Sequence, residues 1–67
     1  MDILMSVGRA LTIAVAVASV LGFTDKEQDK LRSYVNLHAK QWVAAQKREN
    51  EVEAMIKSEA SRISKGS

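Results

Sequence analysis

Residues 10–32, ALTIAVAVASVLGFTDKEQDKLR, change from an uncharged to a highly charged sequence within two residues. No residue from Ala10 to Phe23 is charged, whereas six of the eight residues from Asp25 to Arg32 are. An uncharged, apolar run belongs in an apolar environment, and a highly charged run belongs in water. The stretch therefore divides the chain into residues 1–23 and residues 24–67, and we expect these two parts to have different surroundings.

The composition of the whole chain restricts what it can be. With 67 residues and only three aromatic ones, the chain allows one small domain at most, and a core of this size is marginal. It has no cysteine and one histidine, which excludes disulfides, cysteine-ligated zinc and a multi-histidine metal site within one chain. A net charge of +2 is too balanced for a dedicated nucleic-acid-binding protein. We expect no cofactor and no specific nucleic-acid partner, and we expect a membrane or other chains to supply the burial.

The first part of the chain has the length of a membrane span. The segment from Ile3 to Phe23 would form a helix about 31 Å long at 1.5 Å per residue, close to the roughly 30 Å of a bilayer core. Its one charge, Arg9, would cost about 2.5–3.5 kcal/mol at the bilayer centre. We therefore expect Arg9 at a membrane–water boundary or against an acidic group. A signal peptide is the alternative, and Asp2 with no lysine nearby argues against it.

Every fourth residue of the apolar segment is small. In membranes, rows of small residues let helix backbones approach closely, and packing then drives helix association. An incidental consequence of an alanine-rich composition is the alternative. We predict that this stripe packs helices together; its members are Ser6, Ala10, Ala14, Ala18 and Gly22.

The second part of the chain begins with a helix-start signal. Thr24 is followed three residues later by Glu27, the spacing of a capping box. Lys65 is placed for the last turn, where the helix dipole favours a base. Since the intervening sequence contains neither proline nor glycine, we predict one amphipathic helix from Asp25 to about Lys65, roughly 60 Å long.

Along this second helix, mostly apolar residues recur three or four positions apart and so form a stripe on one face. Such a stripe predicts a face buried against other helices. Glu49 and Glu59 interrupt it, which argues against a regular two-stranded coiled coil. A helix lying flat on a membrane needs a strongly basic polar face, and Glu49, Glu51 and Glu53 argue against that alternative. The predicted partner-helix face consists of Leu31, Val35, His38, Trp42, Ala45, Val52, Ile56 and Ile63.

Two motifs invite a chemical interpretation. The spacing of His38 and Trp42 resembles the proton-selecting HxxxW motif of a small viral proton channel, but the match is two residues outside the apolar segment. We interpret the pair as packing on one helix face. Serine, histidine and acidic residues are all present, but one extended helix cannot bring three of them to a shared point. We therefore expect no enzymatic activity.

The sequence predicts an all-α protein, with a short apolar transmembrane-like helix over residues 1–23, a long amphipathic helix over residues 24–67 and no independent globular core. In outline this is similar to the pore-forming subunit of the twin-arginine translocase. That family has Phe-Gly at the hinge, where this chain has Gly22-Phe23, so we assign no family.

Two hypotheses for function follow. The first is a small single-span membrane protein that oligomerises, or docks as an accessory subunit of a larger membrane assembly, by helix packing. The second is a structural subunit of a virion or helical filament, with the apolar helix buried against copies of itself. For a membrane protein, Lys26, Lys30 and Arg32 beside the span predict that the long helix is cytoplasmic.

Overall fold

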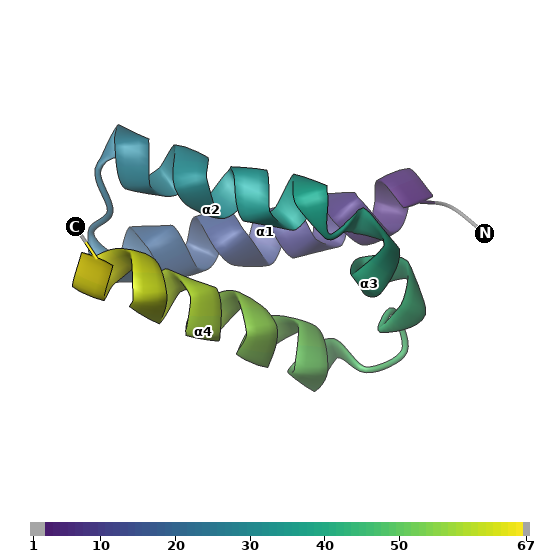
Figure 1. Cartoon of the computed structure of the whole chain (residues 1–67). Helices are drawn as coiled ribbons and strands as arrows, with labels where there is room; N and C mark the ends of the chain where they lie inside the picture. The colour runs from purple at the N-terminus through teal and green to yellow at the C-terminus, as the bar shows by residue number, and fades with distance from the viewer. Residues whose placement is uncertain (1–2, 67) are drawn as a thin grey trace.

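The computed structural model describes residues 3–66, with side chains from residue 4 onward, and it shows four helices (Figure 1). They are α1 (Ile3–Leu21), α2 (Asp25–Leu37), α3 (Ala39–Ala44) and α4 (Glu49–Gly66). The described residues contain no strand. The predicted all-α class and apolar N-terminal helix are confirmed. The rest of the chain differs from the predicted arrangement, because it forms three helices that fold back on α1.

The turn after α1 reverses the chain at Gly22. The Gly22 amide donates to the Ser19 carbonyl at 3.3 Å, and the Phe23 amide donates to the Ala18 carbonyl at 3.0 Å. These two bonds form a Schellman motif, which favours glycine because its central residue is left-handed, and Gly22 has a φ of +68°. The four-residue spacing assigns Gly22 to the small-residue stripe, but the structure places it in this exposed turn.

α2 begins with the predicted capping box, which is confirmed. The Thr24 hydroxyl accepts from the Glu27 amide at 3.4 Å, and the Glu27 carboxylate accepts from the Thr24 amide at 2.9 Å. Asp25 and Glu27 lie in the first turn, where the helix dipole favours acids. Only three residues separate α1 from α2, so α2 returns along α1 instead of extending away from it.

The segment predicted as one helix is divided at two places. α2 ends where His38 has φ −110° and ψ 30°, and α3 ends where Ala45 has φ −99° and ψ 11°. The cause is tertiary packing: α1 has 19 residues and is about 28 Å long, so a straight helix of about 60 Å would carry half of its apolar face past the end of α1. Helix propensity is a weak preference that such packing overrides. The two breaks let α4 return along α1.

The four helices form an elongated bundle that measures 35 × 18 × 17 Å along its principal axes. Figure 1 shows α2 running antiparallel to α1, α4 running parallel to it, and α3 closing the end of the bundle near the start of α1. α1 contacts each of the other three helices. It is therefore the element that holds the bundle together.

The chain has a hydrophobic core of its own, which differs from the expectation that a membrane or other chains supply the burial. Small side chains of α1 meet large ones from α2, α3 and α4, of which Trp42, Leu31 and Ile56 are among the largest that are fully buried. Pairing small with large residues fills the space between helices at the density of a protein interior. The core consists of Ala10, Ala14, Ala18, Leu31, Val35, Trp42, Ala45, Val52, Ile56 and Ala60.

Replacing glycine by alanine is expected to change the stability in opposite directions at Gly8 and at Gly22. Gly22→Ala is expected to destabilise the fold by about 1–2 kcal/mol, because a left-handed backbone brings Cβ close to a carbonyl oxygen. Gly8→Ala, inside α1, is expected to stabilise it by up to about 1 kcal/mol. An added Cβ meets nothing within 4 Å at either position, so the backbone alone decides. Urea unfolding of both variants checks this, and two shifts of the same sign would contradict it.

Candidate helix-packing and membrane-facing surfaces

The small-residue stripe of α1 lies on its buried face. The exposed fraction is 8% for Ser6, 0% for Ala10, 1% for Ala14 and 2% for Ala18. Because these side chains end at Cβ or one atom beyond it, the backbones of neighbouring helices can approach closely. In this structure the neighbours are α2, α3 and α4 of the same chain.

The predicted partner-helix face forms the other half of the core. His38 and Ile63 are half-buried, and the other six members are buried: Leu31, Val35, Trp42, Ala45, Val52 and Ile56. The six buried members form one cluster with the alanines of α1, and Ile63 packs against it. The two stripes that the sequence predicts to pack on other helices thus meet each other within one chain.

Ala60 is a core residue that the predicted face omits. It is fully buried at 0% exposure. The predicted stripe passes from Ile56 through Glu59 to Ile63, whereas α4 buries Val52, Ile56 and Ala60 at steps of four. The four-residue spacing of these apolar residues could have identified Ala60 as buried in the sequence. It does so only if α4 is treated as a separate helix, because a single long helix favours the stripe through Glu59 and Ile63.

Trp42 joins α3 to α2 across the break at His38. Its indole N–H donates to the Val35 carbonyl at 2.6 Å inside the core. A buried tryptophan needs such a partner for its N–H, and this bond pairs a carbonyl of α2 with a side chain that lies beyond the break. The bond therefore stabilises the bent path that divides the predicted helix.

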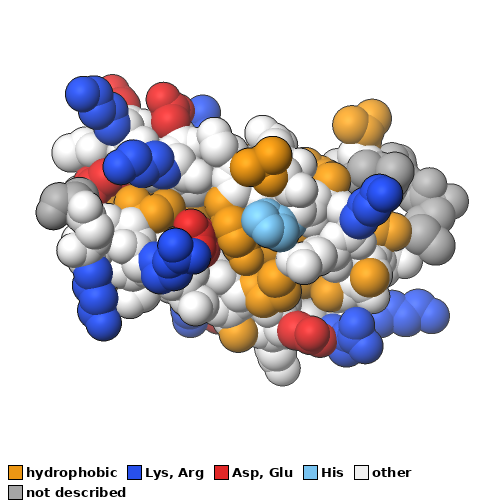
Figure 2. Space-filling model, viewed as in Figure 1, with side chains coloured by type: hydrophobic (Ala, Val, Ile, Leu, Met, Phe, Trp, Pro, Cys, Tyr) orange, Lys and Arg blue, Asp and Glu red, His pale blue; other side chains and the backbone are white. Residues whose placement is uncertain are grey.

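The HxxxW pair belongs to a small aromatic cluster around Tyr34. The ring centroid of Tyr34 lies 4.4 Å from that of His38 and 5.9 Å from that of Trp42. His38 Nδ1 lies 2.8 Å from the Tyr34 carbonyl oxygen. Figure 2 shows the histidine at the surface, among hydrophobic side chains. The arrangement is a packing contact at the end of α2.

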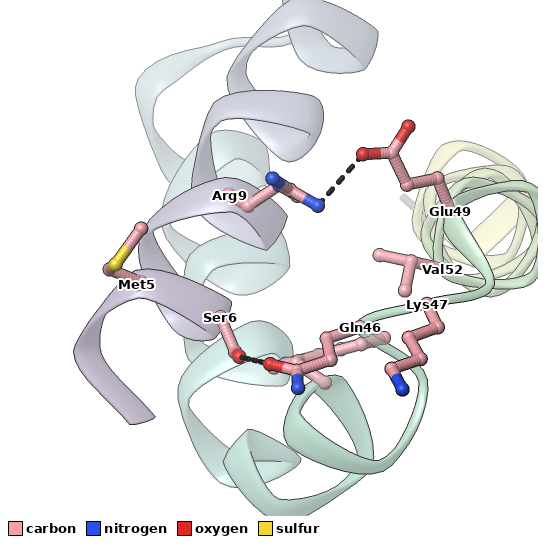
Figure 3. Close-up of a pocket in the computed structure, with 8 residues that line it drawn as sticks. Met5, Ser6, Arg9, Gln46, Lys47, Glu49 and Val52 are labelled. Atoms are coloured by element: carbon pink, nitrogen blue, oxygen red, sulfur yellow. Dashed lines mark hydrogen bonds and ion pairs between the residues drawn. The ribbon is translucent and has the colours of Figure 1, made fainter. Parts of the chain in front are cut away.

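Two polar contacts join the first half of α1 to the start of α4 and to the connection before it (Figure 3). The Arg9 guanidinium lies 2.7 Å from the Glu49 carboxylate, and the Ser6 hydroxyl donates to the Gln46 side-chain oxygen at 3.3 Å. Of the two environments predicted for Arg9, the structure shows the contact with an acidic group. The side chains of Arg9 and Glu49 are 54% and 66% exposed, so the pair contributes less than about 1 kcal/mol.

Several large apolar side chains of α1 are exposed to solvent. We call their surface the bare face; it consists of Leu4, Met5, Val15, Val20 and Leu21, with exposed fractions from 40% to 86%. The Thr12 hydroxyl, which is also exposed, donates to the Gly8 carbonyl at 2.9 Å within the helix. Such bonding inside a helix reduces the need of a hydroxyl for water. The exposed surface of α1 is therefore mostly apolar, and its polar residues are Arg9, Thr12 and Ser19.

α1 is the one helix among residues 3–66 that is long and apolar enough to cross a membrane. Its window Leu4–Leu21 has 18 residues and a mean hydropathy of 1.9. Only 22% of that window is buried in the bundle. The core helix of a soluble protein and a signal sequence near the N-terminus can have the same length and composition.

The described residues offer no site for a metal ion, since none of the groups of His, Asp and Glu side chains among residues 3–66 could hold one. No protein-family model, no curated protein and no solved structure matches the chain. The features of the described residues that suggest a function are the two packing stripes, the polar contacts of Arg9 and Ser6, and the bare face.

Leucine substitutions at two neighbouring positions of α1, one in the stripe and one outside it, are expected to have very different effects on stability. Ala14→Leu is expected to destabilise the bundle by about 1–3 kcal/mol, because the added carbons have no space between closely packed helices. Val15→Leu is expected to change the stability by less than about 0.5 kcal/mol, because Val15 is exposed. Urea unfolding measures both. Equal effects at the two positions would show that the stripe is not a close-packed surface.

Tyr34 predicts a sensitivity to alkaline pH. Burial raises its pKa above the usual 10.0; the charge of Glu59 raises it further, and the charge of Arg62 lowers it. Because the pKa is higher in the folded than in the unfolded chain, the stability linked to Tyr34 is complete below about pH 10 and is lost as the pH rises through the folded pKa. Thermal unfolding from neutral to alkaline pH is expected to show a smaller decrease in Tm for Tyr34→Phe than for the unchanged chain. The same decrease in both would contradict the assignment.

Proposed function

We propose that this chain is a small non-enzymatic membrane protein that docks by helix packing as an accessory subunit of a larger membrane assembly, with α1 as its membrane element. The bare face of α1 carries the proposal. Leu4 and Val20 are 82% and 86% exposed, and Arg9 is the only charged residue from Ile3 to Phe23. Contiguous exposed apolar surface is typical of sites that bind a membrane or another protein.

α1 cannot span a bilayer while it stays in the bundle. α2 and α4 lie along it and carry exposed charged side chains, among them Lys26, Asp29, Lys30 and Glu53. Each charge at the bilayer centre costs about 2.5–3.5 kcal/mol, so the two helices remain in water. The bundle is therefore the form that exists in water and at the membrane surface, and the spanning form requires α1 to separate from α2–α4.

The fully buried contacts of α1 are small ones. Its buried residues are three alanines and one serine, with Val7, Leu11, Ile13 and Val17 partly buried beside them, whereas the large fully buried side chains belong to α2, α3 and α4. Its two polar contacts across the bundle, Arg9–Glu49 and Ser6–Gln46, involve exposed or partly buried groups that water can solvate after separation. Arg9 lies in the second turn of α1, from where its side chain can reach the headgroups.

Separation uncovers the large apolar residues of α2–α4, and this creates the surface for the larger assembly. Leu31, Trp42 and Ile56 are fully or almost fully buried in the bundle, so each loses its cover when α1 leaves. A helix with small residues, from another subunit or from a second copy of this chain, replaces that cover. The row of small residues on α1 is at the same time free to pack on other helices within the bilayer.

The charges that flank α1 set the orientation of this arrangement. Lys26, Lys30 and Arg32 follow the apolar segment closely, and lysine and arginine beside a span favour the cytoplasmic side. The proposal accordingly places α2–α4 in the cytoplasm.

A structural subunit of a virion or filament is the second candidate, and a row of small residues on the exposed side of α1 favours it. Gly8, Thr12 and Ala16 lie four residues apart and are exposed, so copies of α1 could approach closely there. Extraction separates the two candidates. The membrane protein leaves membranes only with detergent and as small oligomers, whereas the structural subunit purifies with particles or fibres without detergent.

Tethering α1 to the rest of the bundle tests the membrane proposal. The chain has no cysteine, so Ser6→Cys with Gln46→Cys supplies one pair that a short bis-maleimide can cross-link. Integration into phosphatidylcholine–phosphatidylglycerol vesicles, scored as resistance to alkaline carbonate, is expected to fall at least about tenfold after cross-linking. The matched control carries Asn50→Cys with Ala54→Cys, two exposed positions that cross-link within α4 alone, and it is expected to integrate normally.

Two outcomes of the tethering experiment contradict the proposal. If the tethered and control proteins integrate equally, α1 does not need to leave the bundle. If neither protein integrates, α1 is not a membrane element.

A further inference from the structure

A groove of about 640 Å³ lies between α1 and α4, apart from the contacts made by Arg9 and Ser6. Its volume is within the range of small-molecule sites, roughly 300–1,000 Å³. The α4 wall is polar and consists of Glu53, Lys57, Ser61, Ser64 and Lys65. The α1 wall has no polar side chain; it consists of Ile13, Ala16, Val17, Val20 and Leu21.

The apolar wall has the length of a short hydrocarbon chain and opens onto the bare face. From Ile13 to Leu21 the helix rises about 12 Å at 1.5 Å per residue. Val20 and Leu21 belong both to this wall and to the bare face. A hydrocarbon chain in contact with the bare face can therefore enter the groove without crossing polar surface.

The polar wall favours an anion. Lys57 lies 2.8 Å from Glu53, but their side chains are 62% and 51% exposed, so this ion pair is weak and its lysine can exchange partners. Lys65, in the last turn of α4, forms no ion pair with any of residues 3–66. The groove thus combines an apolar wall with lysine ammonium groups, which complements a molecule that has an acyl chain and an anionic headgroup.

We infer that the groove between α1 and α4 binds one anionic phospholipid of the membrane, with an acyl chain along the α1 wall and the phosphate at Lys65. The inference rests on the proposed function in that the membrane supplies this lipid. It concerns the bundle at the membrane surface, before α1 separates. The groove then holds the bundle on anionic lipid with the bare face toward the bilayer.

The test uses dihexanoyl-phosphatidylglycerol, at concentrations where it is monomeric, and amide NMR spectra of the full chain. Saturable shifts are expected at groove residues, with Val17, Val20 and Ser61 the most affected. Dihexanoyl-phosphatidylcholine has a headgroup without net charge and is expected to bind about fivefold more weakly. Shifts centred outside the groove, or equal affinity for the two lipids, would overturn the inference.

Two pairs of variants separate the groove from general attraction to the protein. Lys65→Gln is expected to weaken binding of dihexanoyl-phosphatidylglycerol about fivefold, whereas Lys40→Gln, on α3, changes the net charge equally and is expected to have no effect. Ala16→Trp should fill the groove and abolish saturable binding, and the control Ala44→Trp should not. Equal effects of the two lysine variants, or of the two tryptophan variants, would contradict a site in the groove.

Failure of this inference can be distinguished from failure of the proposed function. If Ala16→Trp loses no affinity for the monomeric lipid while the protein still integrates into vesicles, the groove is not the lipid site and the membrane proposal stands. If the monomeric lipid binds in the groove but the protein never integrates, the lipid site stands and the membrane proposal fails. A spectrum that changes with protein concentration in the absence of lipid would identify a second copy as the occupant and overturn the lipid assignment.

Discussion

The close approach of α1 to the other three helices is the contact on which the whole structure depends. It is possible because Ala10, Ala14 and Ala18 present only methyl groups to the core, each with no more than 2% exposure. The large residues that fill the space, such as Trp42 and Ile56, come from α2–α4. The row of small residues on α1 thus packs against the large residues of the other three helices, and together they form the core. A chain of 67 residues without disulfides obtains its core from this complementarity.

The sequence predicted the local parts of this surface better than their arrangement. The capping box at Thr24 and the apolar helix before it depend on neighbouring residues, so their pattern is visible in the sequence. The breaks at His38 and Ala45 could not be predicted, because no proline or glycine marks them. They arise because the second stripe is longer than α1 and is covered only if the chain folds back. The same breaks set the register of α4, which explains why Ala60 was not predicted to be buried.

The same residues of α1 have different contacts in the folded bundle and in the proposed membrane form. Its small-residue stripe can pack on α2–α4 in water, or on other helices in a bilayer, but not on both at once. The apolar bare face is suited to lipid in either case, since nothing in the bundle covers Leu4 or Val20. Under the proposed function the protein has two states, and a membrane that interacts more favourably with the separated form shifts the population toward it. The exposed ion pair between Arg9 and Glu49 sets only a small barrier to that shift.

The central claim is that the two stripes cover each other within a single chain. The most direct test is urea unfolding in detergent-free buffer at protein concentrations that differ by about a hundredfold, combined with sedimentation equilibrium, because the stability of an assembly depends on concentration and that of a monomer does not. The structure predicts a monomer with one cooperative transition whose midpoint is the same at every concentration. A midpoint that rises with concentration, together with a sedimenting oligomer, would show that the stripes are covered between chains and would contradict the claim.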